Sequence, residues 1–337
     1  MRRSIVLVIF GIIYPFAIPF SCAYNGIQES LSSSPSHQQI VNQELDKLEP
    51  SGNGPITVFV PVSSAPAPVT RAAVNDQTGS RSLIPRKRVE FDFGREYYWA
   101  RYVQPGIERQ KGFMSGYEGS LTYRTASSKP IVNMYRLEGQ WAQGKFDNRS
   151  SDGVISWNGI KDNAYEIRGI AGKEFYPLSY FRMTGYSGFG YRYLEDNPEG
   201  LSTVSGGYTI LGYKTFSHYC YMPFGIDMLY QRNRSYSVDS NVEFDYMFRG
   251  WETSNLGVIQ QGYNTTKNLQ TGFGLRLGLR LNLYFKYCDA FAETFLRYWD
   301  IGQSNGILDP VDPVNNPPLE IPKNNTEELG FRFGLLI

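Results

Sequence analysis

A strict alternation of apolar and polar residues runs from Gln270 to Leu283, and this feature constrains the fold more than any other. Residues two positions apart share one face of a β-strand, so alternation indicates a strand with two different faces. One row of the segment contains Phe273 and successive leucines, whereas the other contains glycines, Arg276 and Arg280. The segment therefore predicts a β-strand with one apolar and one polar face.

The same period of two recurs from about residue 88 to the C-terminus. The aromatic content of 15% and the 34 glycines also favour β-structure in which backbones approach closely. We expect about ten strands, with eight or twelve as the alternatives. The expected strands are 94–103, 114–124, 131–142, 163–173, 180–193, 215–230, 236–250, 270–284, 289–299 and 327–337.

The connections between these strands alternate in length. Every second connection is short, whereas the segments 143–162, 194–214, 251–269 and 300–326 are long and 104–113 is intermediate. Membrane-spanning barrels have short turns on the periplasmic side and longer loops outside, and a soluble sandwich has no reason to sort its loops in this way. Residues 88–337 are therefore predicted to form an all-β, transmembrane, antiparallel up-and-down β-barrel.

Arginines and carboxylates dominate the polar row, and the two signs nearly balance. A planar guanidinium pairs well with a carboxylate, and an enclosed charge without a partner would cost several kcal/mol. We therefore expect this row to form a charge network in the lumen, while the apolar row faces lipid. The expected inward acids are Glu96, Glu118, Glu138, Glu166, Asp227, Glu243, Asp245, Glu293 and Glu328. The expected inward arginines are Arg124, Arg136, Arg168, Arg182, Arg192, Arg249, Arg276, Arg280, Arg297 and Arg332.

Aromatic residues gather at the predicted strand ends, as the interface girdles of a membrane barrel require. Trp141, Trp251 and Trp299 fall at the predicted outer ends, and several tyrosines fall near the short turns. These positions predict two aromatic belts that flank the apolar band.

The N-terminus has the pattern of an export signal. Arg2 and Arg3 precede a short apolar stretch, and Ser21 and Ala23 supply the small residues of a cleavage site. We predict a signal peptide over 1–23, with lipidation of Cys22 as the alternative. The Ser-, Gln- and Pro-rich segment 24–87 is predicted to be a flexible periplasmic arm.

The C-terminal segment resembles the assembly signal of Gram-negative outer-membrane β-barrel proteins, of the small uncharacterised type. The matching positions are the polar Glu328, then Gly330, then the hydrophobic Phe333 and Leu335, although the chain ends in Ile337 where an aromatic residue is usual. In that family the last strand is recognised by the barrel-assembly machinery. The resemblance thus implies the same machinery as a partner and the outer membrane as the location.

An enzymatic function is not expected. The chain contains only His37 and His218, which argues against a multi-histidine metal site, and no cofactor is expected. His218 shares its row with apolar residues, so we interpret it as a residue of the rim or lipid interface rather than a catalytic base. The net charge of +1 gives no basic field for nucleic acid.

The expected function is that of an outer-membrane scaffold whose long external loops serve surface recognition or envelope integrity. Its expected partners are outer-membrane lipid and lipopolysaccharide, together with a surface ligand that the sequence does not name. A small passive pore for ions or small solutes is the alternative interpretation. An outer-membrane hydrolase is the third.

Overall fold

The computed structural model describes residues 87–126, 131–205, 207–258, 264–286, 288–308 and 318–337. The expected signal peptide (1–23) and the expected arm (24–87), except for its last residue, lie outside the described residues. Within the described ranges, no helix has the length and apolar character needed to cross a membrane.

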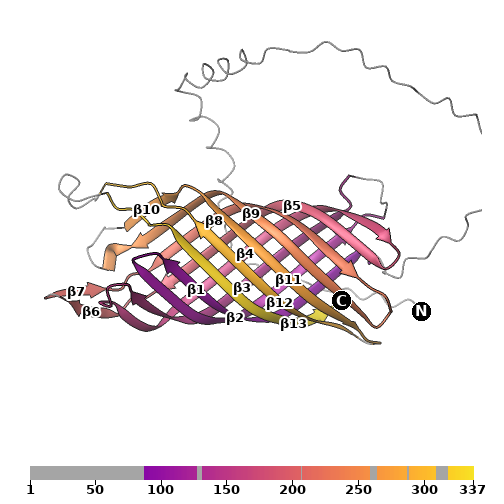
Figure 1. The fold of residues 1–337 in the computed structure, drawn as a ribbon, viewed down its shortest axis with the longest axis horizontal. Helices are drawn as coiled ribbons and strands as arrows, with labels where there is room; N and C mark the ends of the chain where they lie inside the picture. The colour runs from indigo at the N-terminus through magenta and orange to yellow at the C-terminus, as the bar shows by residue number, and fades with distance from the viewer. Residues whose placement is uncertain (1–86, 127–130, 206, 259–263, 287, 309–317) are drawn as a thin grey trace, which may run out of the picture. The chain divides into compact units, whose positions relative to one another are not determined.

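Ten long antiparallel strands form one closed barrel, as the alternation predicts (Figure 1). They are β1 (Val89–Gln104), β2 (Glu108–Arg124), β3 (Met134–Ser150), β4 (Ser156–Leu178), β5 (Phe181–Asn197), β8 (Thr215–Tyr230), β9 (Tyr236–Asn255), β11 (Gly272–Tyr284), β12 (Asp289–Ile301) and β13 (Asn324–Leu336). Shorter elements lie in the connections: β6 (Ser202–Ser205), β7 (Tyr208–Leu211), the 3-10 helix η4 (Leu256–Val258) and β10 (Asn264–Leu269).

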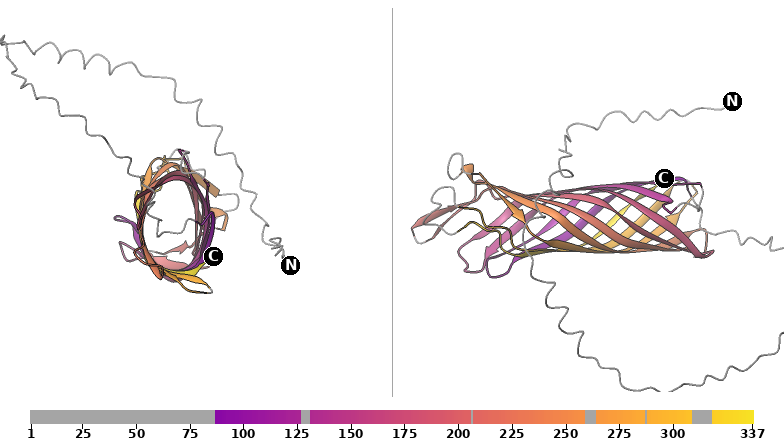
Figure 2. Two further views of the ribbon diagram at one scale, coloured as in Figure 1. Left: turned by 90° about the vertical axis from the view of Figure 1, so that its right-hand side faces the viewer. Right: turned by 90° about the horizontal axis from the view of Figure 1, so that it is seen from above.

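Each strand pairs with its neighbours along the chain, and the seam between β1 and β13 closes the ring, which Figure 2 shows end-on. At this seam Tyr97 lies opposite Phe331 and Glu96 lies opposite Arg332. Alternate residues therefore face opposite sides of a continuous wall. Because every long strand has two partners, the barrel leaves no long unpaired edge.

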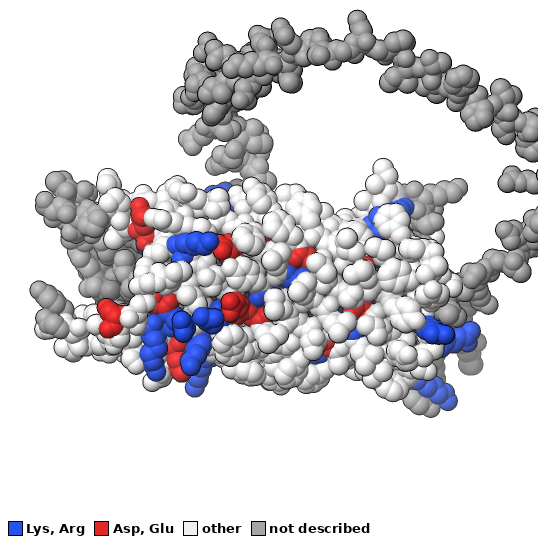
Figure 3. Space-filling model, viewed as in Figure 1, with Lys and Arg blue, Asp and Glu red and all other residues white. Residues whose placement is uncertain are grey.

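The outward row is apolar over the middle of the barrel. Exposed side chains there include Phe93, Leu137, Leu277 and Phe331, and Figure 3 shows this belt as a largely uncharged surface. Charged side chains gather near the ends of β1 and β2, at the end of the barrel that carries β6 and β7. The belt marks the lipid-contacting zone, and the charged end lies beyond it.

The two ends of the barrel differ. Short turns lie at the end of the barrel where β1 begins and β13 ends, for example between Leu178 of β4 and Phe181 of β5. This is the pattern of periplasmic turns, so the opposite end, with β6, β7 and β10, faces outward.

The expected long loops are wrong in extent, because strands continue where loops were predicted. β3 and β4 run on to Ser150 and from Ser156, so the loop expected at 143–162 shrinks to 151–155. The segment 194–214 contains the β6–β7 hairpin, and 251–269 contains the end of β9, η4 and β10. Above the lipid both faces of a strand meet water, so the apolar row that identifies a strand is lost there.

Candidate functional site

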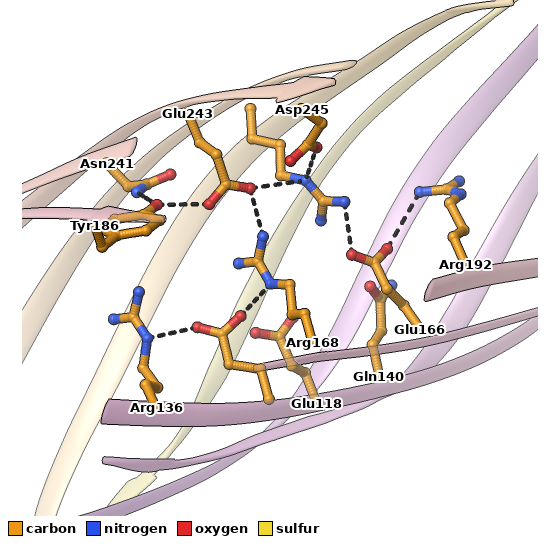
Figure 4. A network of polar contacts seen from close by, with 12 residues as sticks. Glu118, Arg136, Gln140, Glu166, Arg168, Tyr186, Arg192, Asn241, Glu243 and Asp245 are labelled. Carbon is orange, nitrogen blue, oxygen red and sulfur yellow. Dashed lines mark hydrogen bonds and ion pairs between the residues drawn. The ribbon is translucent and has the colours of Figure 1, made fainter. Parts of the chain in front are cut away.

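The middle of the lumen is filled by a network of ion pairs (Figure 4). Arg168 on β4 lies at its centre, where it contacts Glu138 on β3 and Glu243 on β9. Glu243 is 1% exposed, and its other oxygen accepts a hydrogen bond of 2.6 Å from the hydroxyl of Tyr186. The three charges thus join β9 to β3 and β4, which are not its neighbours in the wall.

Arg276 on β11 extends the network. Its guanidinium lies 2.6 Å from Glu166, 2.7 Å from Asp245 and 3.2 Å from Glu243. Because all these side chains are buried, each charge is solvated by protein groups instead of water. Arg276 is therefore the guanidinium that ties β11 to β4 and β9.

A second layer lies nearer the outer end. Arg192 on β5 contacts Glu328 on β13, and these two strands stand on opposite sides of the ring. Glu328 also lies 2.9 Å from Arg297, and Arg192 lies 3.5 Å from Glu166. The Arg192–Glu328 contact therefore crosses the full width of the lumen.

Other expected inward charges pair nearer the periplasmic end. Arg332 lies 2.5 Å from Glu118 and 3.4 Å from Glu293. Arg136 lies 2.7 Å from Glu138 and 3.0 Å from Asp227 on β8, again across the lumen. Further pairs are Arg280 with Asp92, Arg297 and Arg332 with Glu96, Arg124 with Glu90, and Arg124 and Arg182 with Glu174.

Arg249 does not belong to this network, which corrects the expectation from sequence. Phe248 has no partner on β8, because a β-bulge on β9 shifts the register between the Cys220–Arg249 and Tyr221–Met247 pairs. The extra residue reverses which residues of β9 point inward and which point outward beyond the bulge. Arg249 is therefore exposed on the outer surface, where its guanidinium lies 5.6 Å from the ring centre of Trp251.

Two buried tyrosines complete the network, and sequence reasoning missed both. Tyr221 donates a hydrogen bond to Glu166, and Tyr186 donates to Glu243. Both rings fit because a glycine lies opposite: a Cβ added at Gly190 would lie 2.1 Å from the Tyr221 ring, and one at Gly225 would lie 2.3 Å from the Tyr186 ring. The sequence feature that could have indicated these buried tyrosines is the presence of glycines in the inward row of the neighbouring strands.

His218 faces away from the lumen, as its apolar row predicts. Its ring stacks on Trp251 at 4.6 Å between centroids, and its Nδ1 is 2.7 Å from the hydroxyl of Tyr191. Trp299, expected in the outer belt, is instead 1% exposed and points inward, where it contacts Tyr221. Trp299 is two residues from Arg297 and therefore shares the inward row with it, so the alternation of side chains along the strand would have placed Trp299 correctly.

A cavity of about 420 Å³ lies above the network, at the outer end of the barrel. We call it the outer cavity. Arg192, Glu328 and Tyr98 form part of its lining on the network side. Its acidic side chains are Glu108, Asp162, Glu195, Asp196 and Glu252, and its apolar and aromatic ones include Met114, Phe146, Trp157, Tyr213 and Tyr219.

The carboxylates of the outer cavity are only partly exposed to solvent. Asp162 and Asp196 are cross-strand neighbours on β4 and β5, beyond the lipid-contacting belt. Burial raises the pKa of Asp196 to about 6. Burial, followed by the charge of Asp196, holds the pKa of Asp162 well above its usual range. Burial also raises the pKa of Glu108 and of Glu252.

Cations cluster on the outside of the wall near the same end. Three cross-strand pairs on β1 to β4 carry like charges: Arg101 with Lys111, Arg109 with Arg149, and Lys145 with Lys161. Like charges placed directly opposite each other are destabilising. Beside this basic strip lie Trp99, Tyr117 and Trp141, the last two with ring centroids 6.2 Å apart.

The chain is a β-barrel of the kind that spans a membrane. The exposed apolar belt, the flanking aromatic residues and the closed ring of strands are what a bilayer demands of a β-structure that spans it. A soluble barrel would have to leave this same apolar surface in water.

No protein-family model matches the chain, and a search of the curated proteins also finds no match. Among solved structures it is similar to the outer membrane protease OmpT from Escherichia coli, with 10% identity, coverage of 74% of this chain and 95% of that chain, and a TM-score of 0.47. It is also similar to Ail, the attachment invasion locus protein of Yersinia pestis, with 12% identity, coverage of 74% and 100%, and a TM-score of 0.27. The translocator domain of the autotransporter NalP from Neisseria meningitidis shows 10% identity, coverage of 74% and 88%, and a TM-score of 0.36.

Proposed function

We propose that this protein is a non-conducting scaffold of the outer membrane whose outer end recognises a ligand at the cell surface. The observation that carries the proposal is the network of ion pairs across the lumen. Arg192 meets Glu328 from the opposite side of the ring, and Arg136 meets Asp227 across it. A permeating ion would have to displace these buried charges, each of which would then lack its partner.

The spaces left around the network support the same conclusion. One of about 120 Å³ lies among the mid-lumen charges, and one of about 80 Å³ lies nearer the periplasmic end. The outer cavity is several times larger and adjoins the external connections. Free volume is thus concentrated where a surface ligand would arrive, and it is scarce along the path that a solute would need.

Conductance of the refolded protein in planar lipid bilayers tests this proposal. We expect no discrete conductance steps, whereas a porin of about 16 strands, measured in the same bilayers, gives large steps and serves as the control. Reproducible steps from this protein would contradict the scaffold and support the alternative of a small passive pore.

The proposed function is not enzymatic. His218 lies on the outer wall with a ring nitrogen held by Tyr191, and it does not line the outer cavity. Peptide- and lipid-cleavage assays should therefore give the same rates with and without the barrel. A cleavage activity that disappears in His218→Ala would overturn this part of the proposal.

We also propose that outer-leaflet lipid bearing phosphate groups, such as lipopolysaccharide, binds the basic strip. Arg101 already lies 3.4 Å from Glu327, and Lys111 lies opposite Asp147 as well as Arg101, so the excess of positive charge is greatest at the Lys145–Lys161 pair, where an anion would relieve the repulsion. Their place next to exposed aromatic rings matches a molecule with an anionic head and an apolar tail.

The lipid proposal can be tested by extraction from native membranes. We expect the variant Lys111→Gln/Lys145→Gln/Lys161→Gln to retain several-fold less phosphorylated glycolipid per barrel than the unaltered protein. Arg232→Gln/Arg234→Gln, two exposed arginines at the opposite end, is the control and should retain the normal amount. Equal retention by both variants would exclude the basic strip as the binding surface.

A further inference from the structure

We propose that the outer cavity binds an organic cation, an ammonium or guanidinium group carried on an apolar or aromatic body. This inference names the ligand class for the recognition proposed above and rests on that proposal. It depends on three properties of the cavity: an excess of carboxylates, a buried acceptor atom without a donor, and an aromatic wall.

The excess of negative charge is not compensated within the cavity. Among the described residues that line it, Arg192 is the only cation, and it already contacts Glu328 and Glu166. Glu252 lies opposite Lys267 on β10, whose charge favours the ionised carboxylate. Glu108, Asp162 and Asp196 have no comparable cation near them among the lining residues.

Three buried oxygens of the cavity receive no hydrogen bond from any other side chain outside the acid pair: Oδ1 of Asn148, and Oδ1 of the cross-strand neighbours Asp162 and Asp196. Asn148 is 4% exposed and donates its own amide to Glu108 over 2.8 Å. Gln110 donates to Asp196 over 3.0 Å. These side chains are thus fixed in place. Asp162 and Asp196 hydrogen-bond to each other through one shared proton, whereas Oδ1 of Asn148 has no donor among the described residues, although buried acceptors in proteins are normally satisfied.

A donor with positive charge matches both the excess of carboxylates and the open acceptor of Asn148. An ammonium supplies three donors and a guanidinium supplies five, and neither has an acceptor that would compete. An anion or a carbonyl would add a further acceptor to a site that has too many. Charge and hydrogen-bonding capacity hence select the same ligand group.

The rest of the wall favours an organic ligand over a bare metal ion. Trp157, Phe146 and Met114 line the cavity beside the acids, and Tyr213 and Tyr219 lie on its other side. No group of three or more His, Cys, Asp or Glu within the described ranges is arranged to hold a metal ion. A volume of about 420 Å³ suits a small organic molecule or one side chain of a peptide.

Dansylcadaverine, a primary amine with an aromatic fluorophore, is a suitable probe for fluorescence titration of the full-length protein in detergent micelles. We expect saturable binding at pH 7.5, and at least tenfold weaker binding of the N-acetylated, uncharged form. Calcium chloride, added in place of extra sodium chloride at equal ionic strength, should not compete. Equal binding of the charged and acetylated probes, or full competition by calcium, would overturn the inference.

The variant Asp162→Asn/Asp196→Asn should weaken binding of the amine at least tenfold. Asp152→Asn removes a charge from the exposed loop between β3 and β4, outside the cavity lining, and should leave the affinity unchanged. Heat-dependent migration on gels verifies that both variants are folded barrels. If Asp152→Asn weakens binding as much as the double variant, a diffuse surface field and not the outer cavity attracts the amine.

Failure of this inference is separable from failure of the proposed function. A barrel that conducts ions but binds the amine in the outer cavity would contradict the closed scaffold and retain the ligand class. A barrel that neither conducts nor binds the amine would retain the scaffold and exclude the organic cation.

Discussion

Arg276 and Arg249 illustrate how much the environment of a single residue matters in this barrel. Arg276 is buried among Glu166, Glu243 and Asp245, whereas Arg249 is exposed on the outer wall beside Trp251. Removal of a buried charge leaves its partners without compensation, but removal of an exposed one leaves nothing behind. The two arginines should therefore respond very differently to the same substitution.

Arg276→Ala is expected to lower the free energy of unfolding by about 3–5 kcal/mol, because three carboxylates lose their shared cation. Arg249→Ala is the matched control, with an expected change within about 0.5 kcal/mol. Urea titration in micelles, followed by tryptophan fluorescence, measures both. Similar destabilisation by the two variants would mean that Arg249 faces inward after all.

Gly190 tests the fit between the wall and the buried tyrosines. Gly190→Ala would place a methyl group 2.1 Å from the ring of Tyr221, so Tyr221 must move and lose its hydrogen bond to Glu166. We expect a loss of about 1–3 kcal/mol in the same urea titration. Gly185→Ala on the same strand has nothing within 4 Å and should cost less; an equal cost would exclude the clash as the cause.

Asp196 should make the outer end depend on pH. Its carboxyl faces Asp162 on β4 and both Glu108 and Gln110 on β2. Glu195 lies next to it on its own strand, and Glu252 and Lys267 lie across the cavity. The pKa of Asp196 is raised to about 6 in the folded protein, so binding of a proton to this carboxyl favours the folded state at low pH. This contribution to stability is lost as the pH rises from about 4 to above 6.

Asp196→Asn should therefore be more stable than the unaltered protein at pH 7.5 and equally stable near pH 4. Urea midpoints at the two pH values measure the difference, and Asp152→Asn provides the control for loss of one acidic residue in the same region. A gain in stability for Asp196→Asn at pH 4 but none at pH 7.5 would contradict the sign of the effect.

At the scale of the strands, the sequence identifies the ten membrane-spanning segments because lipid and lumen impose opposite polarity on alternate residues. The prediction from sequence is wrong where the contrast in polarity between lipid and lumen ends. The sequence predicts a loop at the outer parts of β3 and β4, because both faces of these strand ends meet water or the cavity and no apolar row marks them as strands. The direction predicted for Arg249 is wrong because the bulge at Phe248 adds one residue to β9 and cannot be recognised from the order of apolar and polar residues.

The candidate site shows the same limit. Alternation placed most of the charges that form the lumen network on the inward row, but it did not indicate which charge meets which. Arg192 and Glu328 are brought together only by closure of the ring. The outer cavity was not predicted, because Gln110, Asn148 and Asp162 come from segments that were assigned to loops.

The last strand offers a matched test of the assembly signal. Phe331 and Phe333 both point outward, with 50% and 48% exposure, and both belong to β13. Only Phe333 occupies a hydrophobic position of the resembled signal. Phe333→Ala should therefore slow insertion by the barrel-assembly machinery in proteoliposomes several-fold, whereas Phe331→Ala should not. Equal slowing of both variants would indicate loss of lipid contact instead of loss of recognition.

At the scale of the whole molecule, the seam between β1 and β13 does more than close the wall. Glu328 and Arg332, both on β13, supply partners to Arg192, Arg297 and Glu118 on three other strands. Until β13 docks, Glu118 lacks Arg332, and Arg192 and Arg297 each lack one of their two carboxylate partners. Strand-by-strand entry into hydrocarbon would expose each of these charges without a full set of partners, so we expect the ring to close before the barrel enters the bilayer.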